Sequence, residues 1–381
     1  MKVVYVDQTG HLGGGEVAIL PWIVAHREGA RVVLFTDGPF RERLESSGVE
    51  VTVLELGSLK DVRRESSLLQ SFSKIGGLLS LRRALAAQLK RADVVYANSQ
   101  KAFLLCVLSK ARGQRLVWHL RDILSAEHFN PWMAKLAVWL ANRSASLVIA
   151  NSHATAEAAI AIGADATRLR VIYDGVSAKP FDSVPAADVT KLRSEIGADA
   201  APVFGLFGRL SPWKGQDVFL EALSRVPEAR GILVGSALFG EDLLEAALRQ
   251  RASQADLAGR VQFLGFRNDV PALMKSVDFI VHASTAPEPF GLVIVEGMLA
   301  EKPVIVANAG GAGEIADNSC AMLVAQGSVE ALVSAMVELL RNPAKAKQMA
   351  ATGRARAEQQ YSLEKMFVGI SGALADVVRH P

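Results

Sequence analysis

The sequence predicts an α/β protein built from two Rossmann-like, doubly wound parallel-sheet domains. Two features favour this fold: short apolar runs alternate with helical segments along most of the chain, and the alternation lapses around residues 177–201. Such alternation is typical of parallel sheets with right-handed crossovers. The chain has 381 residues, more than one ordinary hydrophobic core accommodates, so the lapse indicates a linker between two domains.

Short apolar, mostly β-branched runs locate the expected strands. In the first half they are Val3–Val6, Arg31–Phe35, Val51–Leu54, Val94–Ala97, Leu116–His119, Leu147–Ala150 and Arg170–Tyr173. In the second half they are Pro202–Gly208, Gly231–Val234, Val261–Leu264, Phe279–His282 and Val304–Ala307. Helical patterns separate them, as over Glu16–His26 and Phe103–Lys110, and a long one covers Val329–Leu340.

We place the first domain at residues 1–185 and the second at residues 186–361. The linker between the two sets of strands carries only a short helical pattern, over Asp188–Ile196. Residues 344–378 form a helical tail with a predicted break near Tyr361 and Ser362. The last helix is therefore expected to cover about residues 362–381.

The composition is that of a globular protein, with 50% apolar and 21% charged residues. Cys106 and Cys320 lie far apart and lack metal-ligand spacing, so neither a disulfide scaffold nor structural zinc is expected. Met1–Asp7 is interpreted as a first strand rather than a signal peptide. Because no apolar run has the length to span a bilayer, we expect a cytoplasmic protein, at most peripheral at the inner face of the membrane.

Basic residues gather in the first half of the chain. The net charge is +3, but residues 57–143 alone hold 15 basic side chains against 5 acidic ones. Two helical patterns carry part of this charge, Leu79–Leu89 with two arginines and residues 132–143 with Trp132, Lys135, Trp139 and Arg143. They are either ordinary amphipathic helices packed on a sheet or a face for anionic lipid. Nucleic acid is disfavoured, because few aromatic residues interleave with the basic ones.

The segment from Glu288 to Glu296 places two glutamates eight positions apart around Phe-Gly. Eight residues exceed two helical turns, so the two carboxylates do not sit side by side on one packed helix face. The better geometry has Glu288 in a loop and Glu296 about two turns inside the helix that follows. The helix N-terminus then opens beside Glu288, where backbone N–H groups favour an anion. A nucleotide sugar, with its sugar, diphosphate and ribose, matches this layout.

A second motif, Gly208–Gly215, follows an apolar strand and carries Arg209 and Lys214. Arginine presents a rigid fork to phosphate oxygens, and lysine adds a compact charge. A diphosphate leaving group gains negative charge as its bond to the sugar breaks, so cations here would stabilise the transition state. The alternative is an exposed basic turn.

Two motifs of the first half also follow strands. Gly10–Glu16 is a glycine-rich loop whose spacing differs from the dinucleotide-binding fingerprint, but Gly13 and Gly14 let backbone amides approach a phosphate closely. His119 lies at the carboxyl end of a strand, where ligands of α/β proteins collect. It is a catalytic candidate, although many single histidines are structural.

These motifs together resemble glycosyltransferase family 4, the retaining enzymes of GT-B fold. The signature residues are Glu288, Phe290-Gly291, Glu296, the Pro-Val-Ile run at 303–305 and Gly-Gly-x-x-Glu at 310–314, with Gly-Arg-Leu at 208–210 before Lys-Gly at 214–215. Gly297 replaces a usual alanine and Glu301 a usual small residue. Neither position is a ligand group of the family.

The resemblance implies a retaining transfer of a hexose-type sugar from a UDP- or GDP-linked donor to a hydroxyl acceptor, with no metal and no cofactor. In the second domain it implies that Arg209 and Lys214 hold the diphosphate, Glu296 the ribose and Glu288 the sugar. The amides of Phe290, Gly291 and Leu292 would face the sugar and phosphate, and Arg267 would lie near the base.

The first domain is the acceptor side in this family. There the resemblance implies that Gly13 and Gly14 contact the diphosphate or sugar and that His119 lies near the sugar. It also implies that the domains face each other across a cleft and that the last helix packs back on the first domain. The expected acceptor is a saccharide or a lipid-linked saccharide, in polysaccharide, lipopolysaccharide or glycolipid assembly, with contact to anionic membrane as a further hypothesis.

Other functions remain open at this stage. A GT-B nucleotide-sugar epimerase or a non-catalytic nucleotide-sugar-binding subunit would share the donor motifs. A phosphorylase-like enzyme would have a longer chain and a cofactor lysine. An NAD-dependent dehydrogenase is disfavoured, because the glycine fingerprint is missing.

Overall fold

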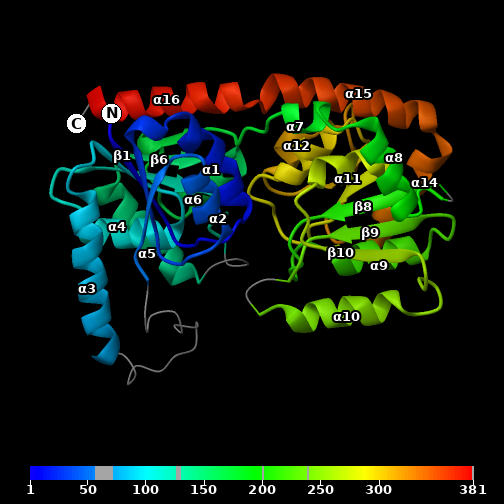
Figure 1. Cartoon of the computed structure of the whole chain (residues 1–381), viewed down its shortest axis with the longest axis horizontal. Helices are drawn as coiled ribbons and strands as arrows, with labels where there is room; N and C mark the ends of the chain where they lie inside the picture. The colour runs from blue at the N-terminus through cyan, green and yellow to red at the C-terminus, as the bar shows by residue number, and fades with distance from the viewer. Residues whose placement is uncertain (56–71, 126–129, 200, 238–239, 380–381) are drawn as a thin grey trace. The chain divides into compact units, whose positions relative to one another are not determined.

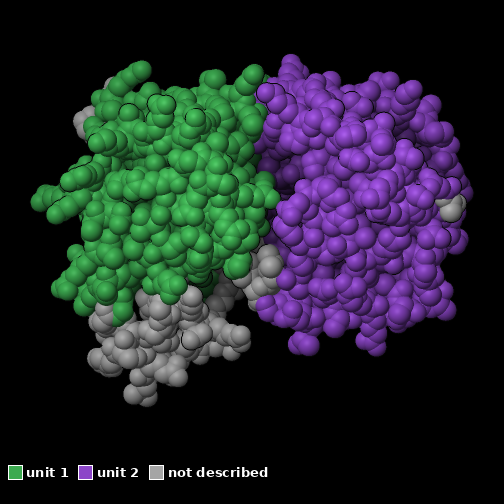
Figure 2. All heavy atoms as spheres, in the orientation of Figure 1, with its two compact units in different colours: residues 1–174, 363–381 green, residues 175–362 purple. Residues whose placement is uncertain are grey.

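The computed structural model describes residues 1–55, 72–125, 130–199, 201–237 and 240–379. The chain forms two compact units, residues 1–174 with 363–381, and residues 175–362 (Figure 2). Each unit holds one parallel sheet covered by helices on both faces. The predicted fold class, two doubly wound α/β domains, is therefore confirmed.

The first unit contains a seven-stranded parallel sheet in the order β3-β2-β1-β4-β5-β6-β7. Chain order reverses direction between β1 and β4, which are neighbours. Ligands of open α/β sheets bind beyond the carboxyl ends of strands at such a reversal. The strands are β1 (Val3–Asp7), β2 (Ala30–Leu34), β3 (Glu50–Val53), β4 (Val94–Ala97), β5 (Arg115–Leu120), β6 (Leu147–Ala150) and β7 (Leu169–Val171).

Helices cover both faces of this sheet (Figure 1). On one face α3 (Phe72–Leu89), α4 (Gln100–Ser109) and α5 (Pro131–Ser144) bury a core that includes Phe103 stacked on Trp118. The other face packs against α1 (Gly14–Ala25), α2 (Pro39–Ser46) and α16 (Leu363–Arg379). Shorter or outer elements are η1 (Arg27–Gly29), α6 (His153–Ala161) and η4 (Ala166–Arg168).

The last helix, α16, belongs to the first unit although its residues end the chain. Its apolar face, with Met366 and Ile370, joins the core beside Trp22 of α1, and Phe367 meets the Trp22 ring edge-on at 5.4 Å. Arg115 at the start of β5 also donates to the carbonyl of Val377. The helical tail breaks between Gln360 and Leu363, at the predicted position.

The second unit contains a six-stranded parallel sheet in the order β10-β9-β8-β11-β12-β13. Its reversal of chain order lies between β8 and β11. The strands are β8 (Val203–Phe207), β9 (Arg230–Val234), β10 (Val261–Gly265), β11 (Phe279–His282), β12 (Val304–Ala307) and β13 (Met322–Val324). Strand β13, three residues long, was not predicted.

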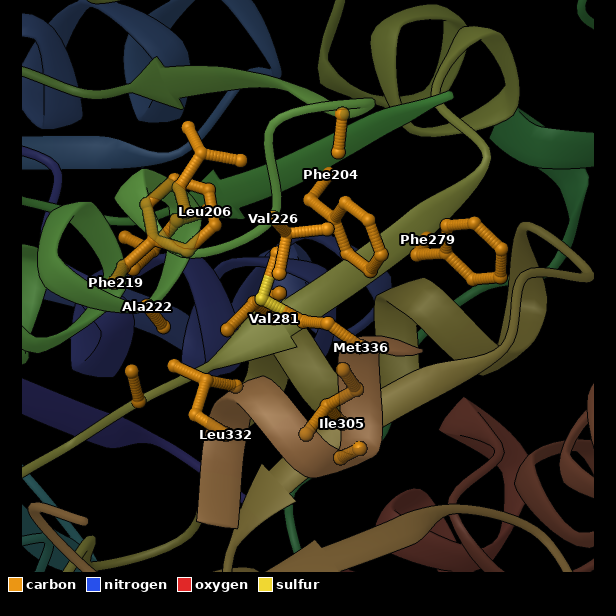
Figure 3. Packing of buried hydrophobic residues seen from close by; sticks show 14 of the residues in the cluster. Phe204, Leu206, Phe219, Ala222, Val226, Phe279, Val281, Ile305, Leu332 and Met336 are labelled. Carbon is orange, nitrogen blue, oxygen red and sulfur yellow. The ribbon is translucent and has the colours of Figure 1, made fainter. Parts of the chain in front are cut away.

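One core of the second unit packs the sheet against α9, α10, α14 and α15 (Figure 3). Phe204 and Phe279, on adjacent strands, stack at 4.6 Å, and Leu332 and Met336 of α14 close the cluster. The helices are α7 (Lys179–Asp182), α8 (Ala186–Glu195), α9 (Gln216–Ser224), α10 (Asp242–Ala252), α11 (Val270–Ser276), α12 (Leu292–Leu299), α13 (Ala312–Ile315), α14 (Val329–Arg341) and α15 (Pro343–Gln360).

The predicted linker region is folded into the second unit. Helices α7 and α8 lie within it, and both pack against α11. The two units separate after Asp174, so the boundary that we placed at 185/186 falls later in the chain, beyond α7. Polar composition does not reveal this packing, because α8 buries little more than Leu192.

Candidate active site

The reversal point of the second sheet gathers two loops. Residues 208–215 leave β8, and residues 283–291 leave β11, its neighbour in the sheet. The backbone N–H of Thr285 donates to the carbonyl of Trp213 at 2.8 Å and ties the loops together. The motifs recognised around Lys214 and Glu288 therefore meet at one sheet edge.

Gly215 allows these loops to touch. Its φ of +70° is left-handed, and a Cβ at this position would lie 1.9 Å from the carbonyl oxygen of Ala283. Only glycine fits both the conformation and the contact. The residue before it, Lys214, is thereby brought to the end of β11.

Lys214 and Glu288 form a bidentate ion pair. Lys214 Nζ lies 2.9 Å from Glu288 Oε1 and 2.8 Å from Oε2. The Glu288 side chain is 9% exposed and the Lys214 side chain 20%. The ammonium also lies over the Trp213 ring, 4.2 Å from its centre. A buried carboxylate and a partly accessible cation are thus held together where a ligand can reach the lysine.

Two further groups hold the Glu288 carboxylate. Ser284 Oγ donates to Oε2 at 2.9 Å, and His282 Nε2 lies 3.3 Å from the same oxygen. Burial alone would raise the pKa of Glu288, but the charge of Lys214 and the hydrogen bond from His282 outweigh it and hold the pKa well below its usual range. Glu288 is therefore ionised at neutral pH. Its Oε1 has a single partner in the described residues, Lys214, which leaves that oxygen able to accept from a ligand hydroxyl.

Helix α12 begins at Leu292, after a loop of three residues that follows Glu288. Gly291 precedes it with a left-handed φ of +112°, and Leu292 is its first residue. We expected Glu296 about two turns into the helix, but it is the fifth residue, just over one turn in. The expectation was wrong because residues 289–291 form the loop that turns the chain into the helix. The N-terminus of α12 nevertheless opens beside Glu288.

Glu296 carries a carboxylate with no partner among the residues that the structure describes. Burial raises its pKa from 4.5 to about 7. Hydroxyl groups that donate hydrogen bonds to a buried carboxyl group with a raised pKa stabilise its charged form. A ribose diol would supply such donors.

The other predicted residues of the second unit lie in different settings. Arg209 Nη1 is 3.4 Å from Glu241, and its carbonyl accepts from Gln216. The Phe290 side chain is buried against Tyr361, so only its backbone could face a ligand. Arg267 pairs with Asp269 at the end of β10, the edge strand, which β9 separates from β8. The structure does not bring Arg267 to the Lys214–Glu288 pair.

The first unit has a polar cluster of its own at the reversal between β1 and β4. Asp7 ends β1, Asn98 follows β4 and Arg121 follows β5. Asn98 Nδ2 donates to Asp7 at 2.6 Å and Asn98 Oδ1 accepts from Arg121 Nε at 2.7 Å. Arg121 Nη1 reaches Asp174, which follows β7, at 2.6 Å. Burial opposes the guanidinium charge, but Asp174 raises the pKa of Arg121, so the charge persists.

His119 lies inside this cluster, 1% exposed. Its Nδ1 is 2.6 Å from Tyr96 Oη and 3.2 Å from Arg121 Nη2. Burial, together with the charge of Arg121, lowers the pKa of His119 well below its usual range. The ring is therefore neutral.

The glycine-rich loop leads from β1 into α1. Gly13 and Gly14 are exposed, and Gly13 caps the helix. The N–H of Gly13 donates to Glu16 Oε2 at 2.9 Å, so this amide already has an acceptor within the chain. Burial and the nearby charge of Asp7 raise the pKa of Glu16. Of the two predicted glycines, Gly14 is the better placed to offer its amide to a ligand.

Within the described ranges no three His, Cys, Asp or Glu side chains gather as a metal site would need. No helix there combines the length and apolar character that crossing a bilayer requires.

Two family profiles match the chain. Residues 13–175 match the glycosyl transferase 4-like domain, and residues 188–356 match the glycosyl transferases group 1. A solved structure of HepE from Anabaena, in complex with UDP and glucose, is 37% identical over 99% of this chain and 100% of its own, with a TM-score of 0.90. The chain belongs to the group 1 glycosyltransferases. Its two sheets are those of the GT-B fold that this family has.

Two further relatives of this glycosyltransferase match over shorter stretches. The lipopolysaccharide core biosynthesis mannosyltransferase LpsB of Rhizobium meliloti is 27% identical over 55% of this chain and 61% of its own. A GDP-mannose-dependent mannosyltransferase of Corynebacterium glutamicum, which acts on a monoacylated phosphatidylinositol monomannoside, is 31% identical over 50% of this chain and 52% of its own. The chain thus spans between half and two thirds of the length of these relatives.

Sequence reasoning missed four residues that organise the two clusters of this glycosyltransferase. Arg121 and Asp174 are absent from the site residues that the sequence predicted. His282 and Ser284 were not considered. All four are polar and stand at or just beyond the carboxyl end of a strand, and this signal could have identified them.

Proposed function

We propose that the protein is a retaining glycosyltransferase that moves a hexose-type sugar from a UDP-linked donor to a hydroxyl acceptor. Lys214 and Arg209 bind the diphosphate, Glu296 binds the ribose diol and Glu288 accepts from a sugar hydroxyl. Backbone amides at the N-terminus of α12 and in the Gly13–Gly14 loop add hydrogen bonds to the diphosphate or sugar. His119 contacts the donor sugar.

The Lys214–Glu288 pair carries this proposal. It sits at the reversal point of a parallel sheet, and the N-terminus of α12 opens beside it. A cation for phosphate and an ionised acceptor for hydroxyls therefore stand next to each other. A nucleoside diphosphate sugar carries phosphate and sugar hydroxyls next to each other in one molecule, so it could engage both members of the pair at once.

The transfer proceeds on one face of the sugar. The bond between the anomeric carbon and the diphosphate oxygen breaks, and the acceptor oxygen forms a bond to the same carbon on the same face. The acceptor's hydroxyl proton passes to the departing diphosphate. Lys214, Arg209 and the helix N-terminus stabilise the charge that develops on the leaving group.

UDP is the preferred nucleotide of the proposal because HepE, a relative that aligns along its whole length, was solved with UDP and with UDP-glucose. GDP is the alternative, because one relative depends on GDP-mannose. It ranks second because that relative matches only about half of the chain.

We further propose that no divalent metal takes part. The cations and the α12 N-terminus already supply positive charge to the diphosphate. Turnover should be unchanged by an excess of EDTA, whereas loss of activity that Mg²⁺ or Mn²⁺ restores would contradict this part of the proposal.

We propose a saccharide or lipid-linked acceptor, in polysaccharide, lipopolysaccharide or glycolipid assembly. The surface of the α3–α4–α5 layer of the first unit supports this proposal, because its side chains suit contact with a membrane. Trp132 and Trp139 of α5 are 68% and 50% exposed, and Leu108 of α4 is 53% exposed. Leu78 and Leu79 of α3 are also exposed. Exposed cations, including Arg83, Lys90 and Lys135, lie on the same helices or just beyond their ends. Aromatic and basic side chains together favour an anionic lipid interface.

Vesicle sedimentation tests the membrane part. The protein should bind phosphatidylglycerol vesicles at low salt, and Trp132→Ala with Lys135→Gln should weaken this binding. Leu243→Ala is the matched control, because Leu243 is 86% exposed on α10 in the other unit. Binding that fails at low salt, where screening is weakest, would remove the membrane contact from the proposal.

The main experiment measures thermal shifts and slow hydrolysis with UDP-, GDP- and ADP-sugars, beside Lys214→Ala and Glu288→Ala. We expect a UDP-sugar to stabilise the protein, Lys214→Ala to reduce this shift and Glu288→Ala to abolish hydrolysis. Selective binding without hydrolysis or transfer to any saccharide acceptor would favour a non-catalytic subunit. Interconversion of UDP-sugars would favour an epimerase, and no response to any donor would contradict the proposal.

A further inference from the structure

The two ring nitrogens of His119 have different surroundings. Nδ1 is contacted by Tyr96 Oη and by Arg121 Nη2, at 2.6 Å and 3.2 Å. Nε2 is buried and has no hydrogen-bond partner in the part of the chain that the structure describes. A buried polar atom without a partner destabilises the folded protein, so its presence needs an explanation.

Arg121 determines which nitrogen carries the proton. A guanidinium only donates hydrogen bonds, so the nitrogen that faces it must offer a lone pair. Nδ1 is therefore bare, and the neutral ring carries its proton on Nε2. The Tyr96 hydroxyl can donate or accept and is compatible with either tautomer, so it cannot make this choice.

The guanidinium of Arg121 is held on several sides. Asn98 Oδ1 accepts from Nε at 2.7 Å and Asp174 Oδ1 from Nη1 at 2.6 Å. Gly15, in the first turn of α1, packs directly on its side chain, because a Cβ there would lie 3.0 Å from Arg121 Cδ. Asp7, through Asn98, and Glu16 add carboxyl groups around the cluster. These contacts thus hold the Arg121 guanidinium in one position beside His119.

We propose that Arg121 is a positioning residue that fixes His119 as a neutral Nε2–H donor for a hydroxyl oxygen of the donor sugar. The contact with the sugar rests on the proposed function, whereas the assignment of the His119 tautomer does not. In this state His119 cannot act as a base, because Nε2 already carries a proton and Nδ1 faces Arg121. The unpartnered N–H receives its acceptor when the sugar binds.

Nuclear magnetic resonance of the protein labelled with ¹⁵N-histidine tests the tautomer without any substrate. The chain has 7 histidines, and the signals lost in His119→Gln identify this one. We expect a protonated Nε2 and a bare Nδ1, with no titration between about pH 5 and 8, where an ordinary histidine changes charge. A protonated Nδ1, or titration in that range, would overturn the inference.

Matched variants separate the two neighbours of Nδ1. Tyr96→Phe should keep the Nε2–H tautomer, because Arg121 still donates. Arg121→Met combined with Asp174→Asn removes the guanidinium without leaving that carboxylate unpaired, and the Nδ1–H tautomer should then appear, donating to Tyr96. Arg121→Lys should restore the Nε2–H form, since an ammonium also only donates. A tautomer change in Tyr96→Phe, or none in the double variant, would contradict the positioning role.

A comparison of UDP-glucose with UDP tests whether the sugar accepts the hydrogen bond from His119 Nε2. Saturating UDP-glucose should shift the His119 Nε2 and its proton, and UDP alone should not. An equal shift with UDP, or no shift while calorimetry shows that UDP-glucose is bound, would remove the sugar contact. If neither compound binds, the proposed function fails and the sugar contact with it, while the tautomer result stands on its own.

Discussion

Lys214 and Glu288 satisfy each other's charge, with Nζ within 2.9 Å of both carboxylate oxygens. A diphosphate that binds Lys214 must therefore share the lysine with Glu288. Ser284 and His282 hold Oε2 of the carboxylate independently of the lysine. Glu288 can consequently keep its position and its charge while Lys214 turns part of its hydrogen bonding to phosphate.

The first prediction concerns Lys214→Met. It should weaken UDP binding by roughly tenfold to a hundredfold, the range that one charged hydrogen bond of about 1.5–3 kcal/mol provides. Uridine, which has no phosphate, should bind with unchanged affinity. Isothermal calorimetry with both compounds measures this difference, and an equal loss for uridine would show that the lysine acts on the fold rather than on phosphate.

The same pair predicts non-additive effects on stability. Lys214→Met and Glu288→Gln should each destabilise the protein, because each leaves a mostly buried partner without its counter-charge. The double variant should lose less than the sum of the two, with a coupling of about 1–3 kcal/mol. Chemical denaturation of the four proteins gives this value, and additive losses would mean that the ion pair contributes nothing beyond its separate side chains.

The second carboxylate of the motif predicts how nucleotide affinity depends on pH. The pKa of Glu296 is raised to about 7, and a ribose diol binds best to the ionised form. UDP affinity should therefore increase with pH and level off above neutrality, by about tenfold between pH 6 and 8 for a single group of this pKa. Glu296→Gln removes this dependence, and it corrects for titration of the phosphate, which both proteins share. Parallel pH profiles in the two proteins would contradict the assignment of Glu296 to the ribose.

Glu296 should also lower the stability of the folded protein at high pH. Its pKa is raised on folding, from 4.5 to about 7, so the folded state holds a proton that the unfolded state releases between these values. The stabilisation from this proton is complete below the unfolded pKa and is lost as pH rises through the folded pKa. Glu296→Gln, which resembles the protonated acid, should therefore raise the melting temperature at pH 8 relative to wild type and leave it nearly unchanged at pH 4. An equal shift at both values would show that the substitution acts through packing.

Sequence could predict the strands and the residues of the motifs because both are local properties. An apolar run shows its strand, and Lys214, Glu288 and Glu296 lie in short stretches with recognisable spacing. The clusters around His119 and Glu288 depend instead on strand order. Arg121 and Asp174 are 53 positions apart and meet because β5, β6 and β7 are consecutive in the sheet. No periodicity of the sequence encodes that contact.

The first residue of α12 is a second feature that the sequence alone did not predict. Spacing alone placed Glu288 before a helix and Glu296 within it, as the structure has them, but the number of helical turns between them was overestimated. The left-handed Gly291 sets the first residue of the helix. The sequence does not show which φ a loop glycine adopts, so it could not predict the first residue of the helix.

The last prediction tests the contact that brings Lys214 to Glu288. Gly215→Ala should destabilise the protein strongly and weaken UDP binding, because the added Cβ would lie 1.9 Å from the Ala283 carbonyl oxygen and must separate the two loops. Gly327→Ala is the matched control: Gly327 has the same φ of +70°, but nothing lies within 4 Å of the added atom. The control should lose only the cost of a left-handed alanine, about 1–2 kcal/mol, and keep its UDP affinity. Denaturation and calorimetry on both variants measure the difference, and equal losses would show that backbone strain, rather than the contact between the loops, makes Gly215 necessary.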